Sequence, residues 1–254
     1  AMTGDGVNDV LALKEADCSI AVASGSDVAC QVSQIVLTDS NFASLPDVVA
    51  EGRRSINNLQ RSGSLFLVKT IFSVVMSLMF IFIVTYNYPF VTIQLTLIDA
   101  FTVGIPSFVL ALEPNRERIR GRFLTRTFSK AIPDGLCLLA SVISILIYGW
   151  VTEVPESELV AMCVLSLSLV SFWLLINLCL PFNWIRVAML VVMGLVCIFI
   201  ITVMPDYIGL VPLSVQDMLV VAVVVLACYP GGQILNFLSR VVFKTIDEYR
   251  KKRK

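Results

Sequence analysis

From residue 62 onward the chain consists mostly of apolar runs, and several are long enough to cross a lipid bilayer. Between Ser62 and Leu112 the only charged residues are Lys69 and Asp99. A membrane-crossing helix needs roughly 20 mostly apolar residues, and the turn-forming Tyr86-Asn87-Tyr88-Pro89 divides this run in two. Hydrophobic windows along the remaining sequence bring the predicted total to six spans, at approximately 62–85, 91–112, 134–152, 159–180, 185–204 and 214–236.

Composition supports the same conclusion. Hydrophobic residues make up 57% of the chain and charged residues only 15%, whereas roughly 25% is charged in soluble proteins. Mean hydropathy is +0.86. None of the seven cysteines forms a C-x-x-C pair, so we infer neither disulfides nor a soft-metal site. We expect a lipid bilayer, and no nucleic acid, among the partners.

The loops between the spans differ in charge. The segment from Glu113 to Lys130 carries six bases, which are Arg116, Arg118, Arg120, Arg122, Arg126 and Lys130. The loops on the other side carry Glu153, Glu156, Glu158 and Asp206 and no bases. Because basic loops stay on the cytoplasmic side, the arginine-rich loop is predicted to be cytoplasmic. An even number of spans then places the N-terminal segment and the basic tail on that side, in a multi-pass protein of the cell membrane.

Residues 1–48 have a different pattern, in which short helical and β-like pieces alternate. Helix-compatible Asn8–Ala16 and Asp27–Ser33 are each followed by a β-rich run, Cys18–Ala23 and Ile35–Thr38. This alternation predicts an α/β layer with parallel strands. About fifty residues are too few to close such a sheet, so we expect the end of a larger domain.

A helical pattern starts near Asn41, passes Pro46 and continues beyond Arg61 into the first apolar run. One helix that begins in water and ends in lipid could transmit force between the two. Two helices hinged at Gly63 are the alternative. The predicted division is an α/β segment at 1–48, a stalk helix at 49–61 and a membrane domain at 62–254, which is mainly α.

The turn Thr3-Gly4-Asp5-Gly6-Val7-Asn8-Asp9 precedes the first helix. It brings two carboxylates into a glycine-rich turn, where Mg²⁺ can bind beside a phosphate, since Mg²⁺ takes one or two carboxylates and keeps several waters. The N–H groups that open the helix favour an anion. The alternative is a structural turn that caps the helix.

Ionisable residues at membrane depth are functional-site hypotheses, because their insertion costs about 2.5–3.5 kcal/mol. Asp99, Thr102 and Pro106 share one helix face, and Pro106 leaves the Thr102 carbonyl without its usual partner. Interrupted helices with free carbonyls coordinate hard cations in transporters. In the preceding span Ser73 lies one turn from both Thr70 and Lys69. That Lys69 simply pairs with Asp99 is a compatible alternative.

Three segments resemble the P-type ATPases. The turn at Thr3–Asp9, continued by Val10–Asp17, is similar to the hinge motif of their haloacid-dehalogenase-like phosphorylation domain. The segment Val36–Phe42 with Glu51-Gly52-Arg53 resembles the lead into their fifth span, and Asp99-x-x-Thr102-x-Gly104-x-Pro106 resembles the sixth. The implied fold is a six-helix transmembrane bundle preceded by the C-terminal piece of a haloacid-dehalogenase-like domain.

The resemblance implies specific roles. Asp5 and Asp9 would hold Mg²⁺, and Thr3, Gly4 and Asn8 would complete the catalytic turn. The residues near the transported cation would be Asp99, Thr102, Thr70 and Ser73. Val103 stands where calcium pumps often have a second acid, and we expect no acid in the later spans. Calcium is nevertheless the favoured ion, with manganese, magnesium and monovalent cations open.

The implied function is ATP-driven cation transport by a longer protein. The D-K-T-G-T phosphorylation motif, the nucleotide-binding domain and the T-G-E loop do not occur in this sequence. We therefore expect an upstream portion of the same pump to bind most of the ATP, and the isolated chain to lack ATPase activity. The alternative is a non-catalytic membrane protein or a secondary transporter with a structural acidic turn.

Overall fold

The computed structural model describes residues 1–82, 87–119 and 122–252. Within it the chain forms two compact units, Ala1–Arg54 and Ser55–Lys254, which are treated separately below. A few predicted features lie outside the described residues: the end of the first span at 83–85, Tyr86, Arg120, and the last two residues of the basic tail.

The first unit is a small α/β layer. Its three strands pair in parallel in the order β1-β2-β3, with Thr3 opposite Ile20 and Ala21 opposite Val36. The predicted alternation of strands and helices is therefore confirmed. The elements in chain order are β1 (Met2–Gly4), η1 (Val7–Asp9), α1 (Val10–Glu15), β2 (Ser19–Val22), α2 (Asp27–Val32), β3 (Ile35–Leu37) and η2 (Phe42–Ser44).

The central strand β2 is buried on both faces. Ala21 packs with Leu13 and Ala29 on the face that α1 and α2 cover. Its neighbours Ile20 and Val22 pack with Leu37 on the opposite face. Successive side chains of a strand point to opposite faces, which explains why both faces of an apolar strand need cover.

Helix α3 runs from Leu45 to Phe82 and passes Gly63 without interruption. The hinged alternative is therefore wrong, and a continuous helix is confirmed. Pro46 lies in its first turn. Backbone N–H groups there make no intrahelical hydrogen bond, so the N–H that proline lacks is not needed. Asn41 caps the preceding 3₁₀ turn, since its side-chain oxygen accepts a hydrogen bond from the Ala43 N–H at 3.0 Å.

The second unit contains the membrane helices. Six helical runs in the described part of the chain are long and apolar enough to cross a membrane, so the chain is a multi-pass membrane protein with the predicted mainly α fold. After α3 the elements are α4 (Thr92–Asp99), η3 (Ala100–Gly104), α5 (Ile105–Ala111), α6 (Phe123–Thr152), α7 (Glu156–Leu178), α8 (Trp184–Val203), η4 (Asp206–Ile208) and α9 (Val215–Lys252).

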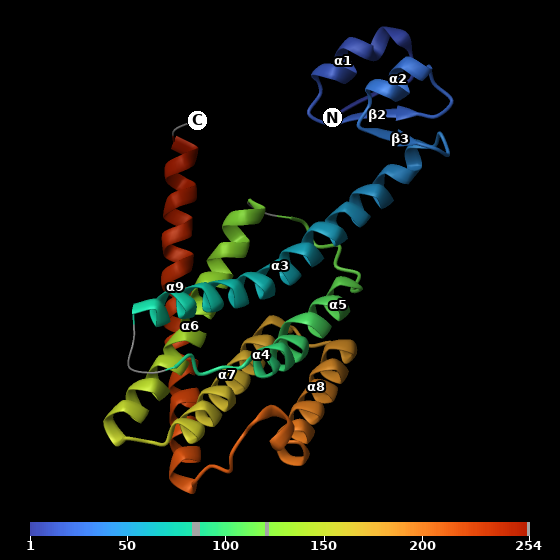
Figure 1. The fold of residues 1–254 in the computed structure, drawn as a ribbon. Helices are drawn as coiled ribbons and strands as arrows, with labels where there is room; N and C mark the ends of the chain where they lie inside the picture. The colour runs from blue at the N-terminus through green and yellow to red at the C-terminus, as the bar shows by residue number, and fades with distance from the viewer. Residues whose placement is uncertain (83–86, 120–121, 253–254) are drawn as a thin grey trace. The chain divides into compact units, whose positions relative to one another are not determined.

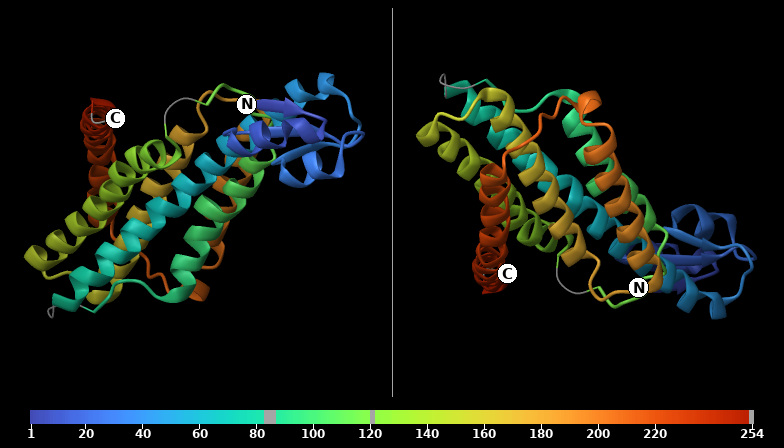
Figure 2. Two further views of the ribbon diagram at one scale, coloured as in Figure 1. Left: turned by 90° about the horizontal axis from the view of Figure 1, so that it is seen from above. Right: turned by 90° about the horizontal axis from the view of Figure 1, so that it is seen from below.

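Two groups of helices form this unit. Helices α6, α7 and α9 pack against one another, and α5 packs against α8 (Figure 1). The views along the perpendicular direction show α3 running beside the α4–α5 segment (Figure 2). The largest buried cluster includes the fully enclosed Met76, Val142, Ile145 and Met162. It joins α3, α6 and α7 and so fixes the positions of these helices relative to one another.

Candidate functional site

The acidic turn lies at the carboxyl edge of the parallel sheet. Asp5 directly follows β1, and ligands of open α/β sheets bind beyond the carboxyl ends of the strands. One oxygen of Asp9, Oδ2, accepts hydrogen bonds from the N–H groups of Asp5 and Gly6, each at 3.2 Å. The Ser26 N–H donates to the Asp5 carbonyl at 2.7 Å. These bonds hold the backbone on either side of the Asp5 carboxylate.

Two glycines are required by this geometry. A Cβ on Gly4 would lie 2.6 Å from the Asp9 Cβ, and one on Gly25 would lie 2.6 Å from the Asp5 carbonyl oxygen. Both distances are shorter than real Cβ contacts, so side chains there would force the turn open. Gly4 is one of the predicted site residues, whereas Gly25 is not one of them.

The predicted catalytic residues gather in this one turn. Thr3, Asp5 and Asn8 are exposed, Asp9 is partly buried and Gly4 is buried. In the described residues no group of three or more His, Cys, Asp or Glu side chains could enclose a metal ion. Two carboxylates in an open turn fit Mg²⁺, which binds through one or two carboxylates and keeps its remaining ligands as water and phosphate oxygens.

In the second membrane run, the predicted helix interruption is a π-helical segment. Between α4 and α5, the N–H of Ile105 donates to the carbonyl of Ala100, five residues earlier. A single π turn inside a helix is frequently found at functional sites. The Thr102 hydroxyl donates to the Ile98 carbonyl at 2.7 Å. The helix therefore stays continuous but locally widened, rather than broken as Pro106 suggested.

A small cavity of about 60 Å³, whose mostly apolar lining includes several charged and hydroxyl side chains, lies beside this π segment. Lys69 Nζ of α3 makes an ion pair with Asp99 Oδ2 of α4. The predicted residues Ser73, Asp99 and Thr102 all line the cavity together with Lys69. The structure therefore brings three of the four predicted cation residues together, and it also shows the Lys69–Asp99 pair.

Thr70 is placed differently. Its side chain is exposed, its hydroxyl donates to the Phe66 carbonyl at 2.8 Å, and it is not among the residues that line the cavity. Lys69 and Asp99 also border an open hollow of about 290 Å³, next to Phe66 and Gly104. The ion pair is therefore accessible from two sides.

Two charged residues of the cavity were missed by sequence reasoning. Lys130 and Asp134 of α6 line it as well, although Lys130 was assigned to a loop and the later spans were expected to carry no acid. The reason is that α6 begins at Phe123, so both residues lie inside a membrane-spanning helix. Their spacing of four, which places two side chains on one helix face, was the available signal.

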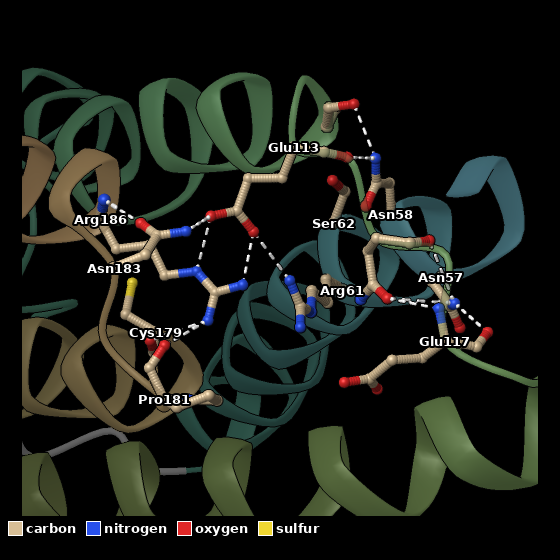
Figure 3. A network of polar contacts seen from close by, with 12 residues as sticks. Asn57, Asn58, Arg61, Ser62, Glu113, Glu117, Cys179, Pro181, Asn183 and Arg186 are labelled. Atoms are coloured by element: carbon tan, nitrogen blue, oxygen red, sulfur yellow. Dashed lines mark hydrogen bonds and ion pairs between the residues drawn. The ribbon is translucent and has the colours of Figure 1, made fainter. Parts of the chain in front are cut away.

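A second buried cluster of charges surrounds Glu113, just after α5 (Figure 3). Its carboxylate accepts hydrogen bonds from Asn183 Nδ2 at 2.7 Å and Arg186 Nε at 2.7 Å. Arg61 Nη1 of α3 contributes a further bond at 3.0 Å. Burial opposes ionisation of Glu113, but the hydrogen bonds and charges of Arg186, Asn183 and Arg61 outweigh it and leave the pKa of Glu113 below its usual value.

The α5–α6 loop is also bound to α3. Asn58 Nδ2 donates to the carbonyls of Ala111 and Glu113, both at 2.8 Å, and Asn57 Nδ2 donates to the Glu117 carbonyl at 2.9 Å. Sequence reasoning assigned Glu113 to a loop and the two asparagines to a polar stalk. The contacts show instead that α3, the loop and the start of α8 form one connected polar network.

No protein-family model matches the chain, but individual proteins do. It is 36% identical over 264 residues to the calcium-transporting ATPase CtpE of Mycolicibacterium smegmatis. This match covers 99% of the chain and 33% of the relative. It is 36% identical over 75% of its length to the probable cation-transporting ATPase exp7 of Streptococcus pneumoniae, where the match covers 25% of the relative.

A more distant relative is the sodium/potassium-transporting ATPase subunit alpha-4 of Homo sapiens, 43% identical over 48% of this chain and 12% of the relative. The chain thus spans about a third or less of the length of these curated relatives. With the hinge-like turn, the six apolar helices and the Asp99 segment, these similarities identify the chain as a member of the P-type, cation-transporting ATPase family.

Proposed function

We propose that the protein containing this chain is an ATP-driven cation pump and that calcium is its favoured substrate. The single observation that carries the proposal is the Lys69–Asp99 ion pair beside a π turn, in a cavity between membrane helices. Charged side chains in such places mark ion pathways. The names of the bacterial relatives, which transport calcium or cations, agree with it.

The acidic turn is the proposed catalytic part. Asp5 and Asp9 would hold Mg²⁺, which supplies neutralising charge to a phosphoryl group during its transfer. Asp9 has a second task, because its Oδ2 fixes the backbone of Asp5 and Gly6. Thr3 and Asn8, exposed on the same turn, would orient the phosphoryl group. ATP would be bound mostly by an upstream portion of the pump.

In the membrane, Asp99, Thr102 and Ser73 offer a carboxylate and two hydroxyl oxygens, and oxygen is the ligand type that calcium prefers. A cation that binds Asp99 must replace the Lys69 ammonium. Lys69 then acts as a built-in counter-charge that keeps Asp99 paired while the site is empty. One such carboxylate also suggests a small ion load.

The parts are proposed to be connected as follows. Residues 1–48 would end the cytoplasmic phosphorylation domain, 49–61 would form the stalk, and 62–254 the membrane domain, with the arginine-rich loop and the basic tail on the cytoplasmic side. Helix α3 supplies Lys69 and Ser73 and continues from the stalk. Movement of this helix would change the cation cavity directly.

The test is ATP hydrolysis by the complete protein, purified and reconstituted in proteoliposomes, with calcium, manganese, magnesium, sodium or potassium added in turn. We expect stimulation by calcium and its loss, or a large fall in calcium affinity, in Asp99→Asn. Asp206→Asn, which changes an exposed acid outside the membrane-spanning helices, is the matched control. An Asp99→Asn pump with unchanged calcium stimulation would refute the ligand role.

The non-catalytic alternative makes a different prediction. If the protein were a secondary transporter with a structural turn, Asp5→Asn would leave cation movement into vesicles intact and independent of ATP. For the proposed pump, Asp5→Asn abolishes ATP-dependent transport, because it removes the charge of the exposed carboxylate at the end of β1, a proposed Mg²⁺ ligand.

A further inference from the structure

The cation cavity holds more charge than the proposed exchange at Asp99 uses. Besides Lys69 and Asp99 it is lined by Asp134 of α6 and by Lys130, one helical turn before it. Two carboxylates and two ammonium groups balance one another while no cation is bound. Once a cation occupies Asp99, the Lys69 ammonium loses its partner, and an unpaired charge at membrane depth is strongly unfavourable.

Asp134 and Lys69 line the same cavity from two different helices, α6 and α3. The neighbour of Asp134, Gly135, faces α3 so tightly that a Cβ there would lie 2.9 Å from Ile71 Cγ2 and 3.3 Å from the Val68 carbonyl oxygen. Val68 is in turn the neighbour of Lys69. Helices α6 and α3 are therefore in close contact next to the two charged residues.

The Asp134 carboxylate is held in place from a third helix. Asn236 Nδ2 of α9 donates to Asp134 Oδ1 at 3.1 Å and to the Gly232 carbonyl at 3.1 Å. One carboxylate oxygen is thereby oriented, and the Asp134 side chain remains a lining residue of the cavity. None of the four ion pairs found in the described residues involves Asp134.

We propose that Asp134 is the second acceptor of the Lys69 ammonium, which pairs with Asp99 when the cation site is empty and with Asp134 when a cation occupies Asp99. Lysine is suited to such a change because its ammonium sits on a flexible four-carbon stem. Asp134 is then a positioning residue, not a cation ligand. This inference rests on the proposed function, since it assumes that a cation binds Asp99.

The experiment is a double-mutant cycle in the complete pump, read as the calcium concentration that gives half-maximal ATP hydrolysis. Asp134→Asn should raise this concentration about tenfold, a typical size for coupling between sites. In a Lys69→Met background, where no ammonium needs a partner, the same substitution should have no further effect. Asp134→Glu, which keeps the charge, should restore most of the affinity.

Lys130→Met is the matched control for the lysine, because it removes the other ammonium of the cavity. It should leave the effect of Asp134→Asn in place. Asn236→Ala covers the case in which Asp134→Asn fails to fold: it releases the carboxylate without changing any charge, and its effect on calcium affinity should also vanish in Lys69→Met.

An equal effect of Asp134→Asn with and without Lys69, or no effect at all, would overturn the inference while leaving the pump intact. Coupling to Lys130 in place of Lys69 would do the same. If the wild-type protein showed no cation-stimulated hydrolysis, the proposed function would fail first and the inference with it.

Discussion

Arg186 binds Glu113 through two nitrogens, with Nε 2.7 Å from Oε1 and Nη2 2.5 Å from Oε2. The two side chains are only 7% and 5% exposed. Arg186 lies in the first turn of α8 and Glu113 just after the end of α5, so this pair joins α8 to α5. Arg61, on α3, shares the same carboxylate.

Replacement of Glu113 by Gln should strongly destabilise the membrane unit. The substitution keeps the side-chain shape but leaves the buried Arg186, and to a smaller extent Arg61, without a counter-charge. Removing one partner of a buried ion pair typically lowers the free energy of unfolding by about 3–5 kcal/mol. Thermal unfolding of the detergent-solubilised chain measures the loss.

The control for that measurement is Glu117→Gln in the same loop. The Glu117 side chain is exposed, and within the described residues only its backbone groups make hydrogen bonds. We expect a change within about 0.5 kcal/mol. Equal melting temperatures for Glu113→Gln and Glu117→Gln would show that the network around Arg186 adds nothing to stability.

Ionisation of Glu113 should also make the stability of the chain depend on pH. Its pKa in the folded chain is lowered. Burial raises the pKa, but the hydrogen bonds from Arg186 and Asn183 and the nearby arginine charges lower it by a larger amount. A lowered folded pKa means that the stabilisation is complete above the unfolded value of about 4.3 and is lost as the pH falls through the folded value.

The wild-type chain should accordingly lose stability in the acid range below pH of about 4, and Glu113→Gln should lack that part of the loss. Melting temperatures of both proteins across the acid range make the comparison. Asp39 contributes in the same direction, because the Ser44 hydroxyl and the Asn41 N–H lower its pKa. Parallel curves for wild type and Glu113→Gln would contradict the assignment to Glu113.

Local patterns in the sequence predicted much of this fold. The alternating pieces at the N-terminus and the apolar runs reflect periodicities that single elements impose, and the structure confirms the parallel strands and the six helical runs. Asp99 and Thr102 could be grouped because they share one helix face. Ser73 could be added because it lies in the preceding span, which is adjacent in sequence.

What sequence reasoning missed depends on contacts between distant elements. Arg186 and Glu113 are 73 residues apart, and Asn236 and Asp134 are 102 apart; no local period links them. The first turns of α6 were read as a charged loop because hydropathy finds the apolar centre of a span, not the polar turns at its end. Lys130 thus falls in the predicted loop, and Asp134, the first residue of the predicted span 134–152, is not among the predicted cation residues.

The two tasks proposed for Asp9 can be separated by substitution. Asn keeps a carbonyl oxygen that can accept the N–H groups of Asp5 and Gly6, but it removes the charge. Ala removes both, and losing acceptors for two N–H groups costs about 1–3 kcal/mol at this partly buried turn. We expect Asp9→Asn to keep the Gly6 amide protected in hydrogen exchange and Asp9→Ala to expose it.

Both variants should lower the apparent Mg²⁺ affinity of ATP hydrolysis by the complete pump, because both remove the second carboxylate. The exchange measurement and the Mg²⁺ titration thus read different tasks of one residue. An Asp9→Asn pump with wild-type Mg²⁺ dependence would show that Asp9 only shapes the turn, and Asp5 would then remain as the sole carboxylate ligand proposed here.

Ser73 and Thr70 provide the last prediction, since the family resemblance treats them alike and the structure does not. Ser73 lines the cavity, whereas the Thr70 hydroxyl is used by the Phe66 carbonyl on an exposed face. Loss of one oxygen ligand worth about 1 kcal/mol should raise the half-maximal calcium concentration roughly fivefold in Ser73→Ala. Thr70→Ala should change it by less than about twofold, as expected of an exposed side chain. Calcium-stimulated ATP hydrolysis by the complete pump distinguishes them, and a larger effect at Thr70 would mean that α3 turns its other face to the cation when it binds.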